Sequence, residues 1–232
     1  MSITALLVGL LLLLPTPAEV VIVQFPMRAK VSLPLGGKNK ADVQRLATTT
    51  KTLIKLEDLR SPQSVLAGMN TYVAWAVSPE GSFDNLGELE IAGTKGLLEA
   101  TTRFDRFAIL ITAEPHYMVD EPSSRIVYKN ESARTLPGVP LKIEVGAYEY
   151  SGLPTNTGVP VLVMEARAAF AIASAAQADR RDETEFRQAR VALDTMEELF
   201  KRASSVEVVS AAAHAAIRQA QRAAIVARQS AR

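Results

Sequence analysis

The chain has 232 residues, with 26 basic and 25 acidic side chains and a formal net charge of +1. This length accommodates one large or two small domains, each able to bury a core. Because the charges nearly cancel, the overall balance gives no signal for nucleic acid or an anionic membrane as a partner. The absence of cysteine excludes disulfides, thiolate catalysis and zinc–thiolate sites.

An apolar run from Ile3 to Leu14 opens the chain and is followed by Pro15-Thr16-Pro17-Ala18. A run of about twelve apolar residues is too short for a membrane-spanning helix, which needs about 20. It suits the core of a secretory signal peptide cleaved near Ala18, although such signals normally begin with a basic residue. We therefore expect residues 1–18 to be a signal peptide and the protein to be exported. An uncleaved anchor and a misplaced start codon are the alternatives.

Residues 19–152 alternate short runs of Val, Ile, Thr, Tyr and Phe with Gly and Pro, which is typical of strands joined by tight turns. We divide them into leading strands with a loop, 19–45, and a β domain, 46–152. The predicted strands are 20–23, 28–33, 46–59, 72–77, 83–91, 97–102, 107–112, 126–128 and 141–150. This pattern predicts an antiparallel, immunoglobulin-like β-sandwich.

Residues 161–232 follow a linker at 153–160, contain no glycine or proline, and are rich in alanine. Their apolar residues recur at alternating steps of three and four, which is the period of one helix face. The three predicted faces are Met164, Ala168, Ala171, Ala175 and Ala178; then Phe186, Ala189, Leu193, Met196 and Phe200; and finally Val209, Ala213, Ala216, Ala220, Ala223 and Ala227.

Two sequence pairs have the spacing of a helix-starting capping box: Asp182 with Glu185, and Ser204 with Glu207. They separate the helical half into three helices. The predicted fold class is therefore α+β, with an immunoglobulin-like antiparallel sandwich followed by a three-helix antiparallel bundle.

Four segments of the strand-rich half form a long pattern: TYVAWAVSPEG at 71–81, NLGEL at 85–89, TT at 101–102 and FAILITAEP at 107–115. This pattern resembles a β domain of bacterial cell-envelope proteins, which occurs in similar form at the extracytoplasmic end of some anti-sigma factors. The helical half, from Glu165 to Ala227, resembles the alanine-rich domain of unknown function that follows it in those envelope proteins.

The resemblance implies a location in the periplasm or at the outer membrane. In that family a peptidoglycan-binding domain, similar to the carboxyl-terminal part of outer membrane protein A, often comes next. The sequence up to Arg232 does not contain that domain. The resemblance therefore implies neither wall anchoring nor any catalytic residue for this chain.

Candidate catalytic residues are few and scattered. We expect His116 and His214 to be exposed, the first in a loop and the second on the polar side of the last helix. Glu88 and Glu90 alternate along one predicted strand, which favours a solvated sheet face, with sugar or ion binding as the alternative. No zinc-binding helix, nucleophile elbow or nucleotide fingerprint occurs. The sequence thus predicts no catalytic, metal or cofactor site, and a hydrolase using His116 or Glu114 is the enzymatic alternative.

A basic stripe on the last predicted helix is the first candidate interaction site. At 100° per residue its members fall within about a third of the circumference; they are Arg218, Arg222, Arg228 and Arg232. Clustered arginines suit an anionic lipid, an anionic wall polymer or an acidic partner helix. A solvated helix face is the alternative interpretation.

Tyr72 and Trp75 form the second candidate site. Because they are three positions apart on a predicted strand, they should point to opposite faces, so that only one belongs to the core. Trp75 then either fills the interior or contributes to an exposed aromatic platform for a glycan.

These observations predict an exported, non-enzymatic cell-envelope protein that acts as a structural spacer or protein-interaction module. Its expected partner is an envelope protein or a cell-wall polymer, without nucleic acid and without a membrane-spanning helix once the leader is removed. The alternative is that the β domain binds a cell-wall saccharide or peptide.

Overall fold

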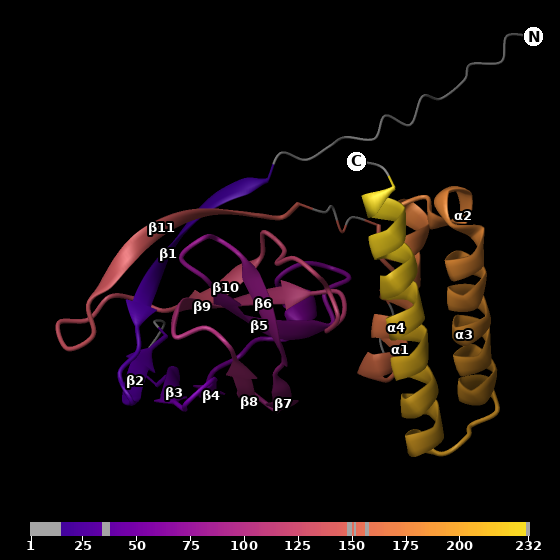
Figure 1. The fold of residues 1–232 in the computed structure, drawn as a ribbon. Helices are drawn as coiled ribbons and strands as arrows, with labels where there is room; N and C mark the ends of the chain where they lie inside the picture. Colours follow the sequence, from indigo (N-terminus) through magenta and orange to yellow (C-terminus); the bar gives the residue numbers. More distant parts are fainter. Residues whose placement is uncertain (1–14, 34–37, 148–149, 151, 156–157, 231–232) are drawn as a thin grey trace, which may run out of the picture.

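The computed structural model describes residues 15–33, 38–147, 150, 152–155 and 158–230 (Figure 1). The protein is α+β, with two antiparallel sheets followed by four helices in this part of the chain. The change from strands to helices falls at Val161, as the composition predicted. Most of the expected signal peptide, residues 1–14, lies outside the described residues, and β1 begins at Thr16.

Strands occupy the first two thirds of the chain. They are β1 (Thr16–Gln24), β2 (Arg28–Ser32), β3 (Lys40–Arg45), β4 (Thr50–Leu56), β5 (Thr71–Val77), β6 (Phe83–Glu88), β7 (Glu90–Ala92), β8 (Lys95–Thr102), β9 (Arg106–Glu114), β10 (Ile126–Lys129) and β11 (Gly138–Val145). One sheet has the order β11-β1-β9-β5-β6, with β10 also paired to β9, and the other has the order β2-β3-β4-β8-β7.

The two sheets form two layers (Figure 1) and contribute to one hydrophobic core. The segment 19–45 was predicted to precede the β domain, and this division is wrong. Its three strands lie inside both sheets: β1 pairs with β11 and β9, while β2 and β3 begin the second sheet. The β module therefore runs from β1 to β11, because strands far apart in sequence complete each sheet.

Several strand predictions differ from the structure: the strand predicted at 46–59 is limited to Thr50–Leu56, and the one predicted at 141–150 is observed at Gly138–Val145. The predicted strand 83–91 divides at Leu89 into β6 and β7, which belong to different sheets. The backbone is irregular next to this division. Gly87 has a positive φ of 113°, and Leu89 N donates a hydrogen bond to Tyr72 O at 2.9 Å. The strand β3 was not predicted, because only Ala41 and Val43 of its six residues are fully buried.

Tyr72 and Trp75 are both fully buried, so the prediction that only one of them belongs to the core is wrong, and the alternative of an exposed aromatic platform is excluded. The strand β5 is central and every residue on it is buried, because both of its faces are covered. On one face Tyr72 Oη donates to Arg60 O at 2.9 Å, and on the other Trp75 Nε1 donates to Thr112 Oγ1 at 2.8 Å. The alternation of side chains was correct, but alternation does not tell whether a second layer covers the far face.

The helical module lies beside the β module (Figure 1). Its helices are α1 (Val161–Ala175), α2 (Ala178–Arg181), α3 (Glu183–Lys201) and α4 (Val206–Gln229). The first predicted helix is interrupted at Gln177, whose left-handed conformation (φ 57°) ends α1 and starts the short α2. The described residues thus form three long helices, α1, α3 and α4, and the additional four-residue helix α2, and α4 packs along both α1 and α3.

The predicted helix faces hold for α4 and partly for α1. All six residues of the α4 face, from Val209 to Ala227, are buried. On α1 nine of fifteen residues are buried, so its buried surface is much wider than one face. Asp182 caps α3 as predicted by accepting a bond from Glu185 N at 3.0 Å. Ser205, one residue later than predicted, caps α4.

The alanine face of α4 yields a test of packing. Ala216 is 1 % exposed, so replacing it with Leu should force α4 away from its neighbours and lower the free energy of unfolding by about 1–3 kcal/mol. Ala211→Leu, at an exposed position of the same helix, should change it by less than about 0.5 kcal/mol. Urea denaturation of both variants measures the difference, and equal effects would contradict close packing at Ala216.

Candidate functional site

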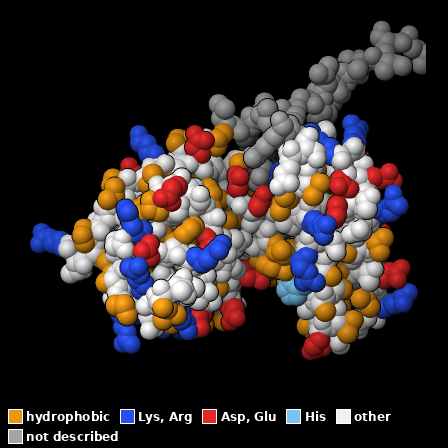
Figure 2. Space-filling model, viewed as in Figure 1, with side chains coloured by type: hydrophobic (Ala, Val, Ile, Leu, Met, Phe, Trp, Pro, Cys, Tyr) orange, Lys and Arg blue, Asp and Glu red, His pale blue; other side chains and the backbone are white. Residues whose placement is uncertain are grey.

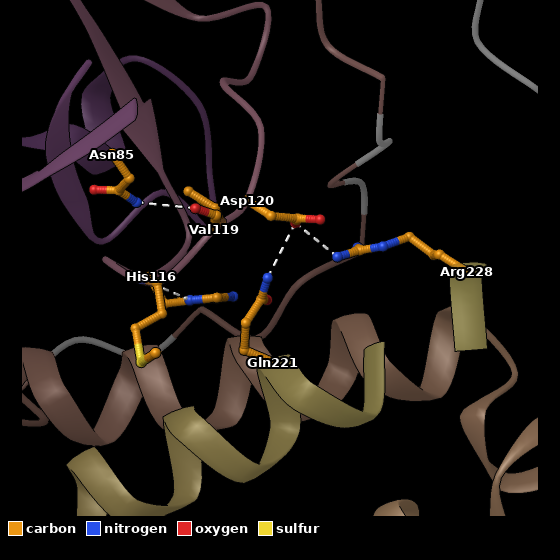
Figure 3. A network of polar contacts seen from close by, with 7 residues as sticks. Asn85, His116, Val119, Asp120, Gln221 and Arg228 are labelled. Atoms are coloured by element: carbon orange, nitrogen blue, oxygen red, sulfur yellow. Dashed lines mark hydrogen bonds and ion pairs between the residues drawn. The ribbon is translucent and has the colours of Figure 1, made fainter. Parts of the chain in front are cut away.

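The loop between β9 and β10, residues 115–125, joins the β module to the helices, and we call it the docking loop. Asn85 on β6 holds its backbone, because Asn85 Nδ2 donates to Tyr117 O at 3.0 Å and to Val119 O at 2.9 Å (Figure 3). At its far end Ser123 N donates to Glu114 Oε1 at 2.7 Å. The loop is thus fastened to the sheet at both ends.

Three side chains on one face of α4 meet the docking loop. His214 Nδ1 is hydrogen-bonded to Tyr117 Oη at 2.8 Å. Asp120 Oδ1 accepts from Gln221 Nε2 at 3.0 Å and from Arg228 Nη2 at 2.7 Å (Figure 3). The three helix residues recur every seven positions, which keeps them on one face of a helix. This face is distinct from the alanine face, so α4 is buried on two sides.

The helix α1 contributes a buried acid to the same junction. Glu165 is fully buried, and its Oε2 accepts from Tyr117 N at 3.2 Å. Burial and then the charge of Glu88 raise the pKa of the Glu165 carboxyl well above its ordinary value. Glu165 Oε1 accepts no hydrogen bond from the described groups. When the Glu165 carboxyl is protonated, however, it can donate its proton in a hydrogen bond to Glu88. Glu165 is therefore the protonated member of a carboxyl pair that spans the two modules.

Glu88 is the partly buried member of this pair. Burial raises its pKa, while a hydrogen bond of 3.0 Å from Thr71 Oγ1 lowers it. The prediction that Glu88 and Glu90 share a solvated sheet face is wrong. Glu90 begins β7 in the other sheet and is exposed, because the chain changes sheets between the two residues.

Behind the docking loop lies a second buried acid, Glu114. Its carboxyl accepts from Thr112 Oγ1 and Ser123 N, and Thr112 in turn accepts from Trp75 Nε1. Burial raises the pKa of Glu114 to about 8, so the carboxyl is protonated at neutral pH. This network ties the central strands to the far end of the docking loop.

His116 was predicted to be exposed, and this is wrong because the docking loop folds inward beneath the helices. It is fully buried, and its Nδ1 accepts from Met118 N at 3.2 Å (Figure 3). Burial, and then the positive charge of Arg228, lower its pKa to about 3. His116 is therefore neutral with its proton on Nε2, and its role is to fill the junction.

The predicted basic stripe does not form one surface. Arg228 bonds Asp120 at 2.7 Å, and Arg222 bonds Glu185 of α3 at 2.9 Å. At 100° per residue these two arginines lie about 120° apart and face different neighbours. Arg218 is exposed, and Arg232 lies outside the described residues. Two of the four arginines thus hold the fold together, which helix geometry alone did not show.

Sequence reasoning missed the residues that make this junction. The available signals were Glu165, the first charge in the apolar start of α1, and the seven-residue spacing of His214, Gln221 and Arg228. Tyr117 and Asp120 lie in a loop and carry no periodic signal at all.

Comparison with known proteins finds no matching family model, no matching curated protein and no matching solved structure. Over the described residues, none of the helices combines the length and apolar character needed to cross a membrane. Positive and negative side chains are intermixed over both modules on the visible face, and a notch separates the modules on its lower side (Figure 2).

The buried acids predict how stability depends on pH. In the unfolded chain Glu114 ionises above its ordinary pKa of 4.5, whereas in the fold it keeps its proton up to about pH 8. Unfolding therefore releases a proton in this range, and the free energy of unfolding falls as pH rises, by up to about 1.4 kcal/mol per pH unit for each such group. His116 acts in the opposite direction, but only below its ordinary pKa of 6.5.

We therefore expect the free energy of unfolding to fall between pH 6.5 and 8, where His116 no longer contributes. Glu114→Gln and Glu165→Gln should each flatten this slope, since an amide does not ionise. Glu99→Gln, on the exposed face of β8, is the matched control and should leave the slope unchanged. Urea denaturation across this range measures the slope, and a wild-type protein equally stable at both ends would contradict the protonated acids.

Proposed function

We propose that this protein is an exported, non-enzymatic cell-envelope protein, periplasmic or associated with the outer membrane, that acts as a rigid structural spacer or protein-interaction module. The finer fold proposed with it is an immunoglobulin-like sandwich followed by an antiparallel three-helix bundle. The observation that supports the proposal is the docking loop, which attaches the β module to α1 and α4 by side-chain bonds.

A spacer has to hold its two ends at a constant separation, and the junction has suitable geometry. Contacts at His214, Gln221 and Arg228 are spread along fourteen residues of α4, or about 21 Å at 1.5 Å per residue. Contacts distributed over such a length oppose rotation of one module against the other more strongly than contacts at one point. The contact from Glu165 on α1 adds a second helix to the same attachment.

Rigidity is tested by the distance between the two modules. The chain has no cysteine, so Met27→Cys and Val206→Cys create two unique labelling sites, at side chains 72 % and 77 % exposed. Electron–electron resonance between spin labels at these sites should give one narrow distance distribution. Asp120→Ala removes the acceptor of both Gln221 and Arg228 and should broaden the distribution, whereas Asp194→Ala, exposed on α3, should not. A broad distribution in the otherwise unaltered protein would contradict a rigid spacer.

The location is tested independently of rigidity. The protein expressed in bacterial cells with residues 1–18 should be recovered from the periplasmic or envelope fraction, and the same protein with charged residues replacing Leu11 and Leu12 should remain in the cytoplasm. Recovery of both proteins from the cytoplasm would contradict export.

The second candidate function, binding of a cell-wall saccharide or peptide by the β module, has one observation in its favour. A shallow hollow of about 570 Å³ lies on the outer face of the second sheet. Its lining combines charged and amide groups with three apolar residues, Ala29, Val43 and Leu53; the polar members include Lys30, Asp42, Gln44, Lys51 and Glu99. Chemical-shift changes confined to these residues on addition of muropeptides would favour this candidate over a spacer.

A further inference from the structure

Three turns of the β module lie together at the end of the sheets, and we call them the distal tip: residues 25–27, 46–49 and 103–105. Phe25 N donates to Asp105 O at 3.3 Å, which joins the first turn to the third. Arg45 N donates to Met27 O at 3.0 Å, and Thr50 Oγ1 donates to Phe104 O at 2.7 Å. These bonds connect all three turns, so their exposed side chains form one surface.

The distal tip exposes apolar side chains that the core does not use. Met27 is 72 % exposed and Leu46 is 44 % exposed. Pro26, which precedes Met27, is also exposed, whereas the partly exposed Phe104 packs against the core. Large apolar side chains gathered on connected turns are unusual for a surface in contact only with water, and they indicate a surface that meets a partner.

The same surface carries an excess of positive charge. Residues 24–28, 45–50 and 102–106 include four arginines and one carboxylate, Asp105. Asp105 bonds Arg45 at 2.9 Å, so it is already neutralised within the tip. The three other arginines, Arg28, Arg103 and Arg106, are exposed and form no ion pair in the described structure. The tip and the strand residues that flank it thus combine exposed apolar side chains with three arginines outside the ion pairs of the described structure.

The strand β9 sets the position of the distal tip relative to the helices. The tip adjoins Arg106 at the start of β9, whereas the docking loop leaves β9 after Glu114. The nine residues of β9 are joined by eight steps of about 3.3 Å, which separate its two ends by roughly 26 Å. The tip and the helical module are therefore at opposite ends of this strand, and the tip can meet a flat surface without obstruction from the helices.

We propose that the distal tip docks on the surface of an anionic lipid bilayer. Met27 and Leu46 enter the headgroup region, and Arg28, Arg103 and Arg106 bind lipid phosphates. This inference rests on the proposed location in the cell envelope, where an exported protein meets a lipid surface. It identifies that lipid surface as the partner bound at one end of the spacer.

The chemistry of the tip favours lipid over the other anionic partners. Arginine forms bidentate bonds with phosphate, and the negative surface of a bilayer attracts clustered cations. A soluble anionic polymer would satisfy the arginines but leave Met27 and Leu46 in water. A bilayer interface satisfies both groups, because apolar side chains enter the acyl boundary while cations remain at the phosphates.

Flotation with lipid vesicles tests the proposal on the full chain. We expect binding to vesicles of phosphatidylglycerol and phosphatidylcholine, weaker binding at high salt, and at least tenfold weaker binding to phosphatidylcholine alone. Arg103→Glu with Arg106→Glu, and separately Met27→Asp with Leu46→Asp, should each weaken binding to the anionic vesicles at least tenfold. The apolar run 3–14 is present in every variant, so any difference in vesicle binding between the variants is caused by the changes at the tip.

Matched controls are available on the helical module. Arg180→Glu with Arg218→Glu makes the same change of charge at two exposed arginines, and Val206→Asp introduces the same acid at a side chain 77 % exposed. Both should bind like the unaltered protein. Thermal unfolding followed by circular dichroism establishes that each variant is folded before its binding is compared.

Insertion is measured directly with a fluorophore on the Met27→Cys variant. Its emission should shift to shorter wavelength on anionic vesicles and be quenched by brominated lipid, whereas a fluorophore on Val206→Cys should show neither change.

No binding to the vesicles, equal binding to neutral and anionic vesicles, or loss of binding in the Arg180→Glu, Arg218→Glu variant but not in the tip variants would each overturn the proposal. None of these outcomes contradicts the proposed spacer function. That function is tested separately by the distance between spin labels and by cell fractionation, which do not depend on lipid binding.

Discussion

The contact between the docking loop and one face of α4 is the constraint on which the arrangement of the molecule depends. Three residues spaced by seven, His214, Gln221 and Arg228, reach a loop that is itself fastened to β6 and β9. The alanine face of the same helix packs within the helical module. A single helix thus links both modules, because its two buried faces serve different neighbours.

This contact excludes water from several titratable side chains. Because a buried charge is costly, their burial determines which of them carry a proton. Glu114 and Glu165 are acids enclosed by sheet, loop and helix, and each is buried at lower cost when it is neutral. His116 is neutral for the same reason. The junction therefore contains two uncharged acids, Glu114 and Glu165, an uncharged imidazole, the partly buried carboxyl of Glu88, and an ion pair at its rim, Asp120 with Arg228. Its strength depends on pH through the acids and on salt through the rim.

The ends of β9 have different chemical characters. Beyond Glu114 the chain enters the docking loop, where Tyr117, Asp120 and Ser123 form hydrogen bonds within the molecule. Before Arg106 the chain forms the distal tip, where Met27 and Leu46 are exposed and the one ion pair among the described residues joins Arg45 to Asp105. One end of the β module is therefore complete in itself, while the other has the composition of a surface that meets something else.

Sequence reasoning found the strands with continuous apolar runs, β5 and β9, because a buried central strand needs no alternation. It missed β3, where only Ala41 and Val43 are fully buried, and it joined β6 to β7 because no proline marks the change of sheet at Leu89. It identified the arginines of α4 as a group from their angular spacing. It did not identify Asp120 and Glu185, which bind two of them, because both partners lie on other elements.

By itself the sequence determined the boundary between strands and helices at Val161, the alanine face of α4 and the cap at Asp182. These features follow from propensity, periodicity and spacing within a few residues of one another. Only the tertiary structure decided that Trp75, His116 and Glu165 are buried, that Arg228 is an internal partner, and that three separate turns form the distal tip. Burial and pairing of this kind depend on residues tens to a hundred positions away, and local pattern carries no information about which distant surface will cover a side chain.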